Sequence, residues 1–374
     1  MSTITLCAVG DVAAFFREPE SMFVHTADVL KAADITFGQN ERHYSNRYDE
    51  ERDLLPGVPL TELCPLEHAA ALKLGGFGVM SFASNHCMDL GADAMLETIA
   101  ALRGNGCAVI GAGSNIEEAR KPAIFERKGT RIAYLAYCSV GRVGWDAGAQ
   151  RAGCAPLRAL TYYQQTDYQP GTPPTIISMV VREDLEAMRQ DIRKAKEQAD
   201  IVVVSCHWGL HHISGAIAMY EKEAAHAAID AGADLIIGHH PHMLKGIEIY
   251  KGKGIFYSMG NFAFDLPLSV RLKRQKQMGS KHAFHSIKVD PEYADWYSWS
   301  AESRRSMIVK CSIVNKTIQK LSFLPVLINN RAQPVIVSRE EDVQDALKYM
   351  KEISASQGFA TAFRAEQGEI EIAA

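Results

Sequence analysis

The stretch V202-V-V-S-C-H-W-G209 decides the fold, because a run of apolar residues ends abruptly on a histidine. Two more stretches have the same form: S81-F-A-S-N-H-C-M-D89 passes to Asn85 and His86, and L235-I-I-G-H-H-P-H242 ends in three histidines. Short apolar runs of this kind are typical of buried strands in a sheet that is covered on both faces. The polar residues that follow them therefore indicate a site beyond the carboxyl ends of strands.

Helical segments separate these strands. Arg182–Gln198 is charged with a helical period and precedes the strand Ile201–Cys206, and the Ala-rich segment Tyr220–Ala231 precedes Leu235–Ile237. Strand, helix and strand in alternation predict βαβ units and a largely parallel sheet, so the fold class is α/β. The same pattern predicts a helix over Asp89–Arg103 and strands at Ile4–Val9, Ile35–Phe37, Val79–Ala83, Val109–Ile110, Arg131–Cys138 and Ile255–Tyr257.

The chain changes character after Phe264. Five basic residues and no acidic one lie in 271–281, and four aromatic residues lie in 293–299, which predicts either a lid over an anionic substrate or a solvated loop. Two strands, Met307–Ile313 and Leu321–Ile328, follow, joined by a hairpin-like turn, and an amphipathic helix over Glu340–Ile353 is expected as the last element. We expect one domain over 1–374, with a core over 3–266, an insertion or lid at about 267–305, and C-terminal strands and a helix over 306–374. These strands form either a second sheet layer or a completed sheet edge.

The composition is that of a globular protein without a surface for polyanions. The 374 residues are 47% hydrophobic and 22% charged, with a net charge of −4, so nucleic acid and anionic membranes are poor partners. No stretch approaches 18 consecutive apolar residues, and no membrane span is expected. The N-terminus predicts a first strand rather than a signal peptide, and the eight cysteines include no C-x-x-C pair. These features favour structural thiols and a cytoplasmic protein, with a homo-oligomer left open.

Carboxylate, amide and imidazole side chains follow five predicted strands. They are Asp11, Glu41, Asn85 with His86, His207, and His240 with His242, and seven of the thirteen histidines fall between 207 and 242. Each has an ordinary alternative role, such as a turn for Asp11, a helix cap for Asn85 or a buried core histidine for His207. Together, without thiolate, they suit Mn, Fe or Zn, and we expect one or two divalent ions. Residues at i and i+2 of an extended chain share a face, which favours His240 over His239 as the partner of His242.

The motifs that carry these residues occur in order along the chain: G10-D11-V12, N40-E41, S84-N-H-C-M-D-L-G91, C206-H-W-G209, G238-H-H-P-H-M-L-K-G-I-E248 and Y257-S-M-G-N-F-A-F264. The set resembles the bacterial capsule-synthesis CapA family (poly-γ-glutamate synthesis), which looks like a branch of the calcineurin-like metallophosphatases. The resemblance covers about residues 3–266. It implies a metallophosphatase-like four-layer αββα sandwich of two mixed sheets, with a metal pair on the rim.

The resemblance also implies roles for the site residues. Glu41 takes the place of the bridging carboxylate; the remaining metal ligands are Asn85, His207 and His240 for one ion, and Asp11 and His242 for the other. His86 corresponds to the general acid, and Asp89 could orient it. Asn40, His239 and Asn261 are predicted substrate-binding residues. Arg142 is added to them because it lies in a loop after a strand end, where a guanidinium could bind a carboxylate or phosphate, although a solvated surface residue is the alternative. Typical metallophosphatases have Asp-x-His at the first strand, whereas this chain has Asp11-Val-Ala13, so one imidazole ligand is absent.

Three functions are consistent with this pattern. The leading hypothesis is a metal-dependent hydrolase, in which a metal-activated water attacks a phosphoester or a γ-glutamyl-type amide of a small anionic or glutamate-containing substrate. The same metals could instead assist proton abstraction next to a carbonyl, as in an isomerase or epimerase. The third possibility is a non-catalytic protein of capsule or polyglutamate assembly.

Overall fold

The structure, a computed structural model, describes residues 3–13, 15, 18–47, 64–168, 171–272 and 288–373. Its elements include the helices α1 (Ala27–Ala32), α3 (Gly91–Gly104), α4 (Ile116–Ala119), α5 (Arg182–Gln198), α6 (Met219–Ala231) and α8 (Glu340–Ala355). Short 3-10 helices are η1 (Pro19–Ser21), η2 (Leu66–Gly75), η4 (Pro291–Tyr293) and η5 (Glu302–Arg304). No helix in these ranges is long and apolar enough to span a membrane.

The first sheet has ten strands and is built around β1. Its order is β19 (Ala362–Glu366), β20 (Glu369–Ala373), β17 (Thr317–Ile328), β16 (Arg305–Val314), β1 (Ile4–Ala13), β2 (Ile35–Asn40), β3 (Val79–Ser81) and β4 (Ala108–Ile110). Two short strands lie off this path, β15 (Asn261–Phe264) beside β1 and β18 (Pro334–Ile336) beside β17. Strands β1 to β4 are parallel, whereas β16 runs antiparallel to β1, so the sheet is mixed.

The second sheet has six strands, in the order β13 (Ile247–Tyr250), β14 (Lys253–Phe256), β12 (Leu235–His239), β11 (Ile201–His207), β7 (Thr130–Cys138) and β6 (Ala123–Arg127). Its four central strands are parallel, and the two outer strands β13 and β6 are antiparallel to their neighbours. The expectation of one largely parallel sheet is therefore wrong in detail. Parallel strands form the centre of this sheet, whose edges are the hairpin partners β13 and β6, and they also form one side of the first sheet.

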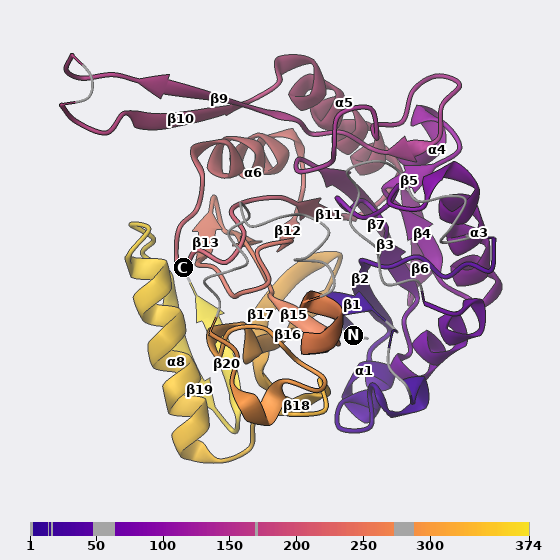
Figure 1. Cartoon of the computed structure of the whole chain (residues 1–374), viewed down its shortest axis with the longest axis vertical. Helices are drawn as coiled ribbons and strands as arrows, with labels where there is room; N and C mark the ends of the chain where they lie inside the picture. The colour runs from indigo at the N-terminus through magenta and orange to yellow at the C-terminus, as the bar shows by residue number, and fades with distance from the viewer. Residues whose placement is uncertain are drawn as a thin grey trace.

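Alternation along β7 shows how the layers pack. Leu135 and Tyr137 pack with α5 and α6 in one apolar cluster, whereas Tyr134 belongs to the cluster between the sheets, where it stacks on Phe37 of β2 with ring centroids 6.1 Å apart. On the other side of the first sheet, α3 contacts β4 and η2. The two sheets thus face each other with helices outside them, which confirms the predicted sandwich of two mixed sheets (Figure 1).

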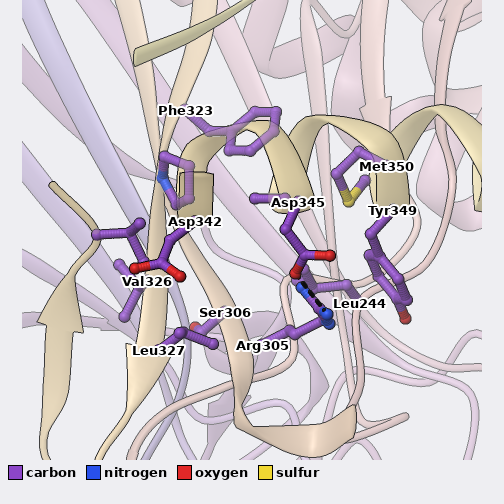
Figure 2. Close-up of a pocket in the computed structure, with 13 residues that line it drawn as sticks. Leu244, Arg305, Ser306, Phe323, Val326, Leu327, Asp342, Asp345, Tyr349 and Met350 are labelled. Atoms are coloured by element: carbon purple, nitrogen blue, oxygen red, sulfur yellow. Dashed lines mark ion pairs between the residues drawn. The ribbon is translucent and has the colours of Figure 1, made fainter. Parts of the chain in front are cut away.

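The C-terminal part completes the edge of the first sheet rather than forming a separate layer. Strand β16 pairs with β1, and the turn between β16 and β17 has positive φ at Asn315 and Lys316, as a tight hairpin requires. The predicted final helix is α8, but the hairpin β19–β20 follows it, so the helix is not the last element. A pocket lies where α8 packs on β16 and β17, with an Arg305–Asp345 ion pair of 2.7 Å at its edge (Figure 2). None of the predicted site residues lines this pocket.

Two smaller pairs of strands lie apart from the large sheets: β5 (Ala112–Gly113) with β8 (Gly153–Cys154), and β9 (Ala159–Gln164) with β10 (Thr175–Val180). The β9–β10 ribbon extends away from the body of the molecule (Figure 1). The predicted lid lies partly outside the described residues, because 273–287 are not described. Of its aromatic residues, Tyr297 and Trp299 are buried.

Candidate metal centre

Two buried carboxylates form the middle of the site. Asp11 lies inside β1 and not after its end, since the strand continues to Ala13 beyond a bulge between Asp11 and Val12. Its backbone N–H donates to Gly260 O over 3.0 Å, and a side chain at Gly10 would lie only 1.9 Å from the same oxygen, so glycine is required there. Glu41 follows β2, and its N–H donates to Val12 O. Both side chains are fully buried.

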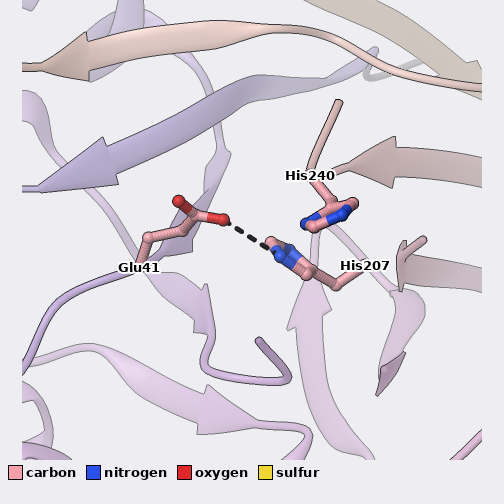
Figure 3. Close-up of side chains that lie close together, drawn as sticks. All are labelled: Glu41, His207 and His240. Carbon is pink, nitrogen blue, oxygen red and sulfur yellow. Dashed lines mark ion pairs between the residues drawn. The ribbon is translucent and has the colours of Figure 1, made fainter. Parts of the chain in front are cut away.

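Imidazoles from the second sheet face these carboxylates. His207 Nε2, at the end of β11, lies 3.0 Å from Glu41 Oε1 (Figure 3). The same nitrogen lies 2.8 Å from Asn85 Oδ1. His242 Nδ1 lies 3.4 Å from Asp11 Oδ2, and its Nε2 lies 3.9 Å from Glu41 Oε2. The ligand atoms of Glu41, His207 and His240 lie within 4.8 Å of one another, and so do those of Asp11, Glu41 and His242. Glu41 belongs to both groups, as a bridging ligand would.

The donor chemistry of the cluster fits a divalent cation. Within the described part of the chain, the four buried carboxylate oxygens of Asp11 and Glu41 make no hydrogen bond of regular geometry, although imidazoles of His207, His239 and His242 lie 3.0–3.9 Å from them. Burying two ionised carboxylates without compensating charge is costly, and a metal ion supplies that charge. Carboxylate and imidazole ligands without thiolate suit Mn, Fe or Zn.

The pKa shifts of Asp11, Glu41 and His240 favour the protonation states that metal ligands need. Burial raises the pKa of Asp11, but the close approach and charge of His239 and His242 outweigh burial and hold it below its usual range. Burial and the charge of Asp11 raise the pKa of Glu41, and the charges of His242 and His207 bring it below its usual value. Burial lowers the pKa of His240 well below its usual value, and nearby histidines add to this effect. Ionised carboxylates and a neutral imidazole are the forms that bind metal.

The loop after β12 holds its ligands in strained backbone. His240 has φ of +95° and His242 has φ of +57°, a region that side chains other than glycine rarely adopt. Such strain persists where the surrounding structure fixes it, and it is concentrated at functional sites. In this conformation His240 belongs to the ligand group of Glu41 and His207. His239, at the end of β12, is fully buried, and its Nδ1 lies 3.4 Å from Asp11 Oδ1.

His86 lies in the turn between β3 and α3, next to the predicted ligand Asn85. Its Nδ1 is 2.6 Å from Asp89 Oδ2, and the imidazole is 21% exposed while the carboxylate is 2% exposed. Burial raises the pKa of Asp89, but the charge of His86 and its hydrogen bond lower it overall. Helix α3 begins at Gly91 with Leu90 as its N-cap, so neither Asn85 nor His86 caps it. The pair is therefore available for another role.

The predicted substrate-binding residues lie in different environments. Asn40 is buried, and its Nδ2 donates to Arg42 O over 2.8 Å. Asn261 is also buried, and its Oδ1 lies 2.7 Å from His242 Nδ1. Arg142 is exposed, with its guanidinium 5.1 Å from the centre of the Trp145 ring. His239 lies between the sheets against Asp11, as described above.

Three residues of the site were not predicted. His211 stacks on His240 with ring centroids 3.7 Å apart, His212 lies 5.5 Å from His242, and Trp299 lies 4.4 Å from His242. The excess of histidines between 207 and 242 was the available signal for His211 and His212. Trp299 belongs to the segment that was predicted as a lid or a solvated loop, and the sequence pattern did not single it out as a site residue.

Comparison with known proteins agrees with the motif order. The family model described as "Bacterial capsule synthesis protein PGA_cap" matches residues 5–266. The chain belongs to this family. Among relatives in the capsule-synthesis family, the PGA biosynthesis protein CapA of Bacillus subtilis (strain 168) is 32% identical over 252 residues, which cover 66% of this chain and 57% of that protein. The capsule biosynthesis protein CapA of Bacillus anthracis is 31% identical over 274 residues, covering 70% and 60%. This chain thus spans under two thirds of the length of these two relatives.

Among solved structures, the calcineurin-like phosphoesterase YfkN from Bacillus subtilis matches with a TM-score of 0.43 and 12% identity, covering 95% of this chain and 98% of that chain. The assignment of the fold rests on the sheets and helices described above. The assignment of the family rests on the sequence match.

Proposed function

We propose that this chain is a metal-dependent hydrolase that cleaves a phosphoester or a γ-glutamyl-type amide of an anionic substrate. The observation that carries the proposal is that Glu41 belongs to both ligand groups, one with His207 and His240 and the other with Asp11 and His242. Asn85 would add an amide oxygen to the first group, because its Oδ1 lies beside His207 Nε2. Bound ions would activate a water nucleophile and polarise the bond to be cleaved.

The protein's own acid would be His86. The ionised Asp89 accepts the Nδ1–H, which leaves Nε2 as the atom that donates a proton to the leaving group. The partial exposure of the imidazole lets a substrate reach it, while burial of Asp89 keeps the hydrogen bond out of water. Cleavage of a γ-glutamyl amide is supported by the relatives' role in PGA biosynthesis, and cleavage of a phosphoester by the metal-ligand pattern.

A second candidate function is non-catalytic assembly of a capsule polymer. It is favoured by the names of the relatives, which refer to biosynthesis and not to hydrolysis. In that case the ions would stabilise the fold or hold a carboxylate-rich polymer, and His86 would have no role in turnover.

The test combines elemental analysis of the purified protein with a panel of phosphoesters and γ-glutamyl peptides. We expect one or two metal equivalents, lost together with turnover in His207→Ala. His86→Asn should keep its metal and lose about 10²- to 10⁴-fold in kcat, the range for a general acid. The matched control is His226→Ala, because His226 pairs with Glu248 over 2.9 Å on α6 and contacts none of the ligands.

Metal-free protein with full activity would refute the hydrolase. A protein that holds its metal and cleaves nothing in the panel, with or without His86, would favour assembly.

A further inference from the structure

A chain of hydrogen bonds runs from His242 to the segment after residue 288. Asn261 Oδ1 lies 2.7 Å from His242 Nδ1, and Asn261 Nδ2 donates to the Tyr297 hydroxyl over 2.9 Å. The Tyr297 hydroxyl in turn donates to Ser303 O over 2.5 Å. All four residues are buried, so water does not compete for these groups.

Counting the protons along this series of hydrogen bonds shows which group donates and which accepts in each of them. Burial raises the pKa of Tyr297 well above its usual value, so the hydroxyl keeps its single proton. Ser303 O is a carbonyl and can only accept, so that proton lies on the Tyr297–Ser303 hydrogen bond. The tyrosine oxygen must therefore accept from Asn261, whose NH₂ group faces it. The opposite end of the amide, Oδ1, then faces His242, and an amide oxygen can only accept.

From this count we propose that Tyr297 and Asn261 are positioning residues: they hold a proton of His242 on Nδ1, so that Nε2 is the nitrogen presented to the proposed metal site. The inference rests on the proposed metal site, since Nε2 is the His242 nitrogen beside the bridging Glu41. Ligating histidines generally donate their other ring N–H to such a partner, which fixes both the tautomer and the ring orientation.

Asp11 is the rival acceptor for the same proton, and the distances decide against it. Asp11 Oδ2 lies 3.4 Å from His242 Nδ1, against 2.7 Å for Asn261 Oδ1, so the amide makes the stronger hydrogen bond. Because the Asn261 amide accepts the hydrogen bond from His242, the carboxylate of Asp11 remains available as a metal ligand.

The far end of this series of hydrogen bonds lies outside the part of the sequence that matches the family model. The family match ends at residue 266, whereas Tyr297 and Ser303 lie beyond it. The segment is fastened to the end of β15 by backbone hydrogen bonds, from Leu266 N to Trp296 O (2.8 Å) and from Ser298 N to Leu266 O (2.9 Å). The segment around 296–303 thus contributes to the metal centre without supplying a ligand.

The test measures Mn²⁺ binding to the chelator-stripped full chain by isothermal titration calorimetry. Tyr297→Phe and Asn261→Leu should each weaken Mn²⁺ binding by about 10- to 100-fold, as loss of such partners does. Asn261→Asp keeps an acceptor for His242 and should retain most of the affinity. The matched control is Tyr137→Phe, which removes another buried hydroxyl, bonded to Asp191 over 3.0 Å on the α5 side, and should change affinity less than about twofold.

A second measurement reads the tautomer directly. In metal-free protein labelled with ¹³C,¹⁵N-histidine, at a pH where His242 is neutral, the His242 signals, identified by their loss in His242→Gln, should show the Nδ1–H form and become mixed in Asn261→Leu. An Nε2–H form in the unsubstituted protein would overturn the inference, as would equal weakening of Mn²⁺ binding by Asn261→Leu and Asn261→Asp. If the unsubstituted protein binds no Mn²⁺ while the Nδ1–H form is present, the proposed function fails and the tautomer assignment stands.

Discussion

Replacing Asp89 with asparagine tests the proposed general acid without changing a predicted metal ligand, because Asp89 contacts His86 and belongs to neither ligand group. The carboxylate forms a 2.6 Å hydrogen bond with His86 Nδ1 at a site where it is 2% exposed. A hydrogen bond to a charged group contributes about 1.5–3 kcal/mol. If that contribution is lost from the transition state, kcat falls by about 10- to 150-fold, since about 1.4 kcal/mol corresponds to a factor of ten in rate.

The assay compares kcat, KM and metal content of Asp89→Asn with those of the unsubstituted protein, using the best substrate of the panel. Metal content and KM should stay the same, because asparagine has nearly the same shape and the ligands are intact. The matched control is Asp184→Asn, since Asp184 is also a buried carboxylate in a short ion pair, 2.7 Å from Arg158, but lies at the start of α5. An unchanged kcat in Asp89→Asn, with metal retained, would refute the role of Asp89 in orienting His86.

Two further predictions concern acid stability and the stacked histidine. Glu118 accepts from Ser114 N and Oγ and pairs with Arg103, which lowers its pKa to about 2. Because the pKa of Glu118 is lower in the folded than in the unfolded state, the ionised carboxylate contributes to stability above about pH 4.5, and this contribution is lost as pH falls toward 2. Glu118→Gln should therefore lower the Tm at pH 7 and not at pH 2, as measured by calorimetry. His211→Ala should weaken Mn²⁺ binding several-fold because His211 stacks on His240, and His211→Phe should restore it; a phenylalanine variant as weak as alanine would show that stacking is not what matters.

Periodicity in the sequence predicted the elements whose burial is regular. Helix α5 has the bounds that were predicted, and β11 differs from the prediction only by including His207. Such elements are visible because a buried strand or an amphipathic helix repeats its apolar residues at a fixed spacing. The mixed character of both sheets was predicted by the family resemblance and not by the alternation of strands and helices, which does not show that β6 and β13 run antiparallel to their neighbours.

The site residues also fall into two groups, those that the local sequence reveals and those whose position depends on tertiary contacts. Residues that directly follow apolar runs, such as His207 and Glu41, were predicted as ligands, and the structure brings them together. Asp11 was placed after its strand, whereas β1 continues past it through a bulge, because pairing with β15 and β2 extends the strand beyond its apolar run. Pairing between distant strands of this kind is set by tertiary contacts, and local sequence does not encode it.

The contributions of Tyr297 and Trp299 show why a motif-based description of this site stops short. Family motifs include His242 and Asn261, but the direction of the Asn261 amide depends on which group faces its other end. That group is a hydroxyl whose own proton is committed to Ser303 O, and nothing in the spacing from residue 261 to 297 reveals it. The candidate ligands are therefore predictable from the sequence, whereas the orientation of His242 depends on packing of a segment that is remote in sequence. A relative with the same motifs and a different segment here would keep the ligands and lose the constraint on His242, so its metal affinity should be lower for the same ligand set.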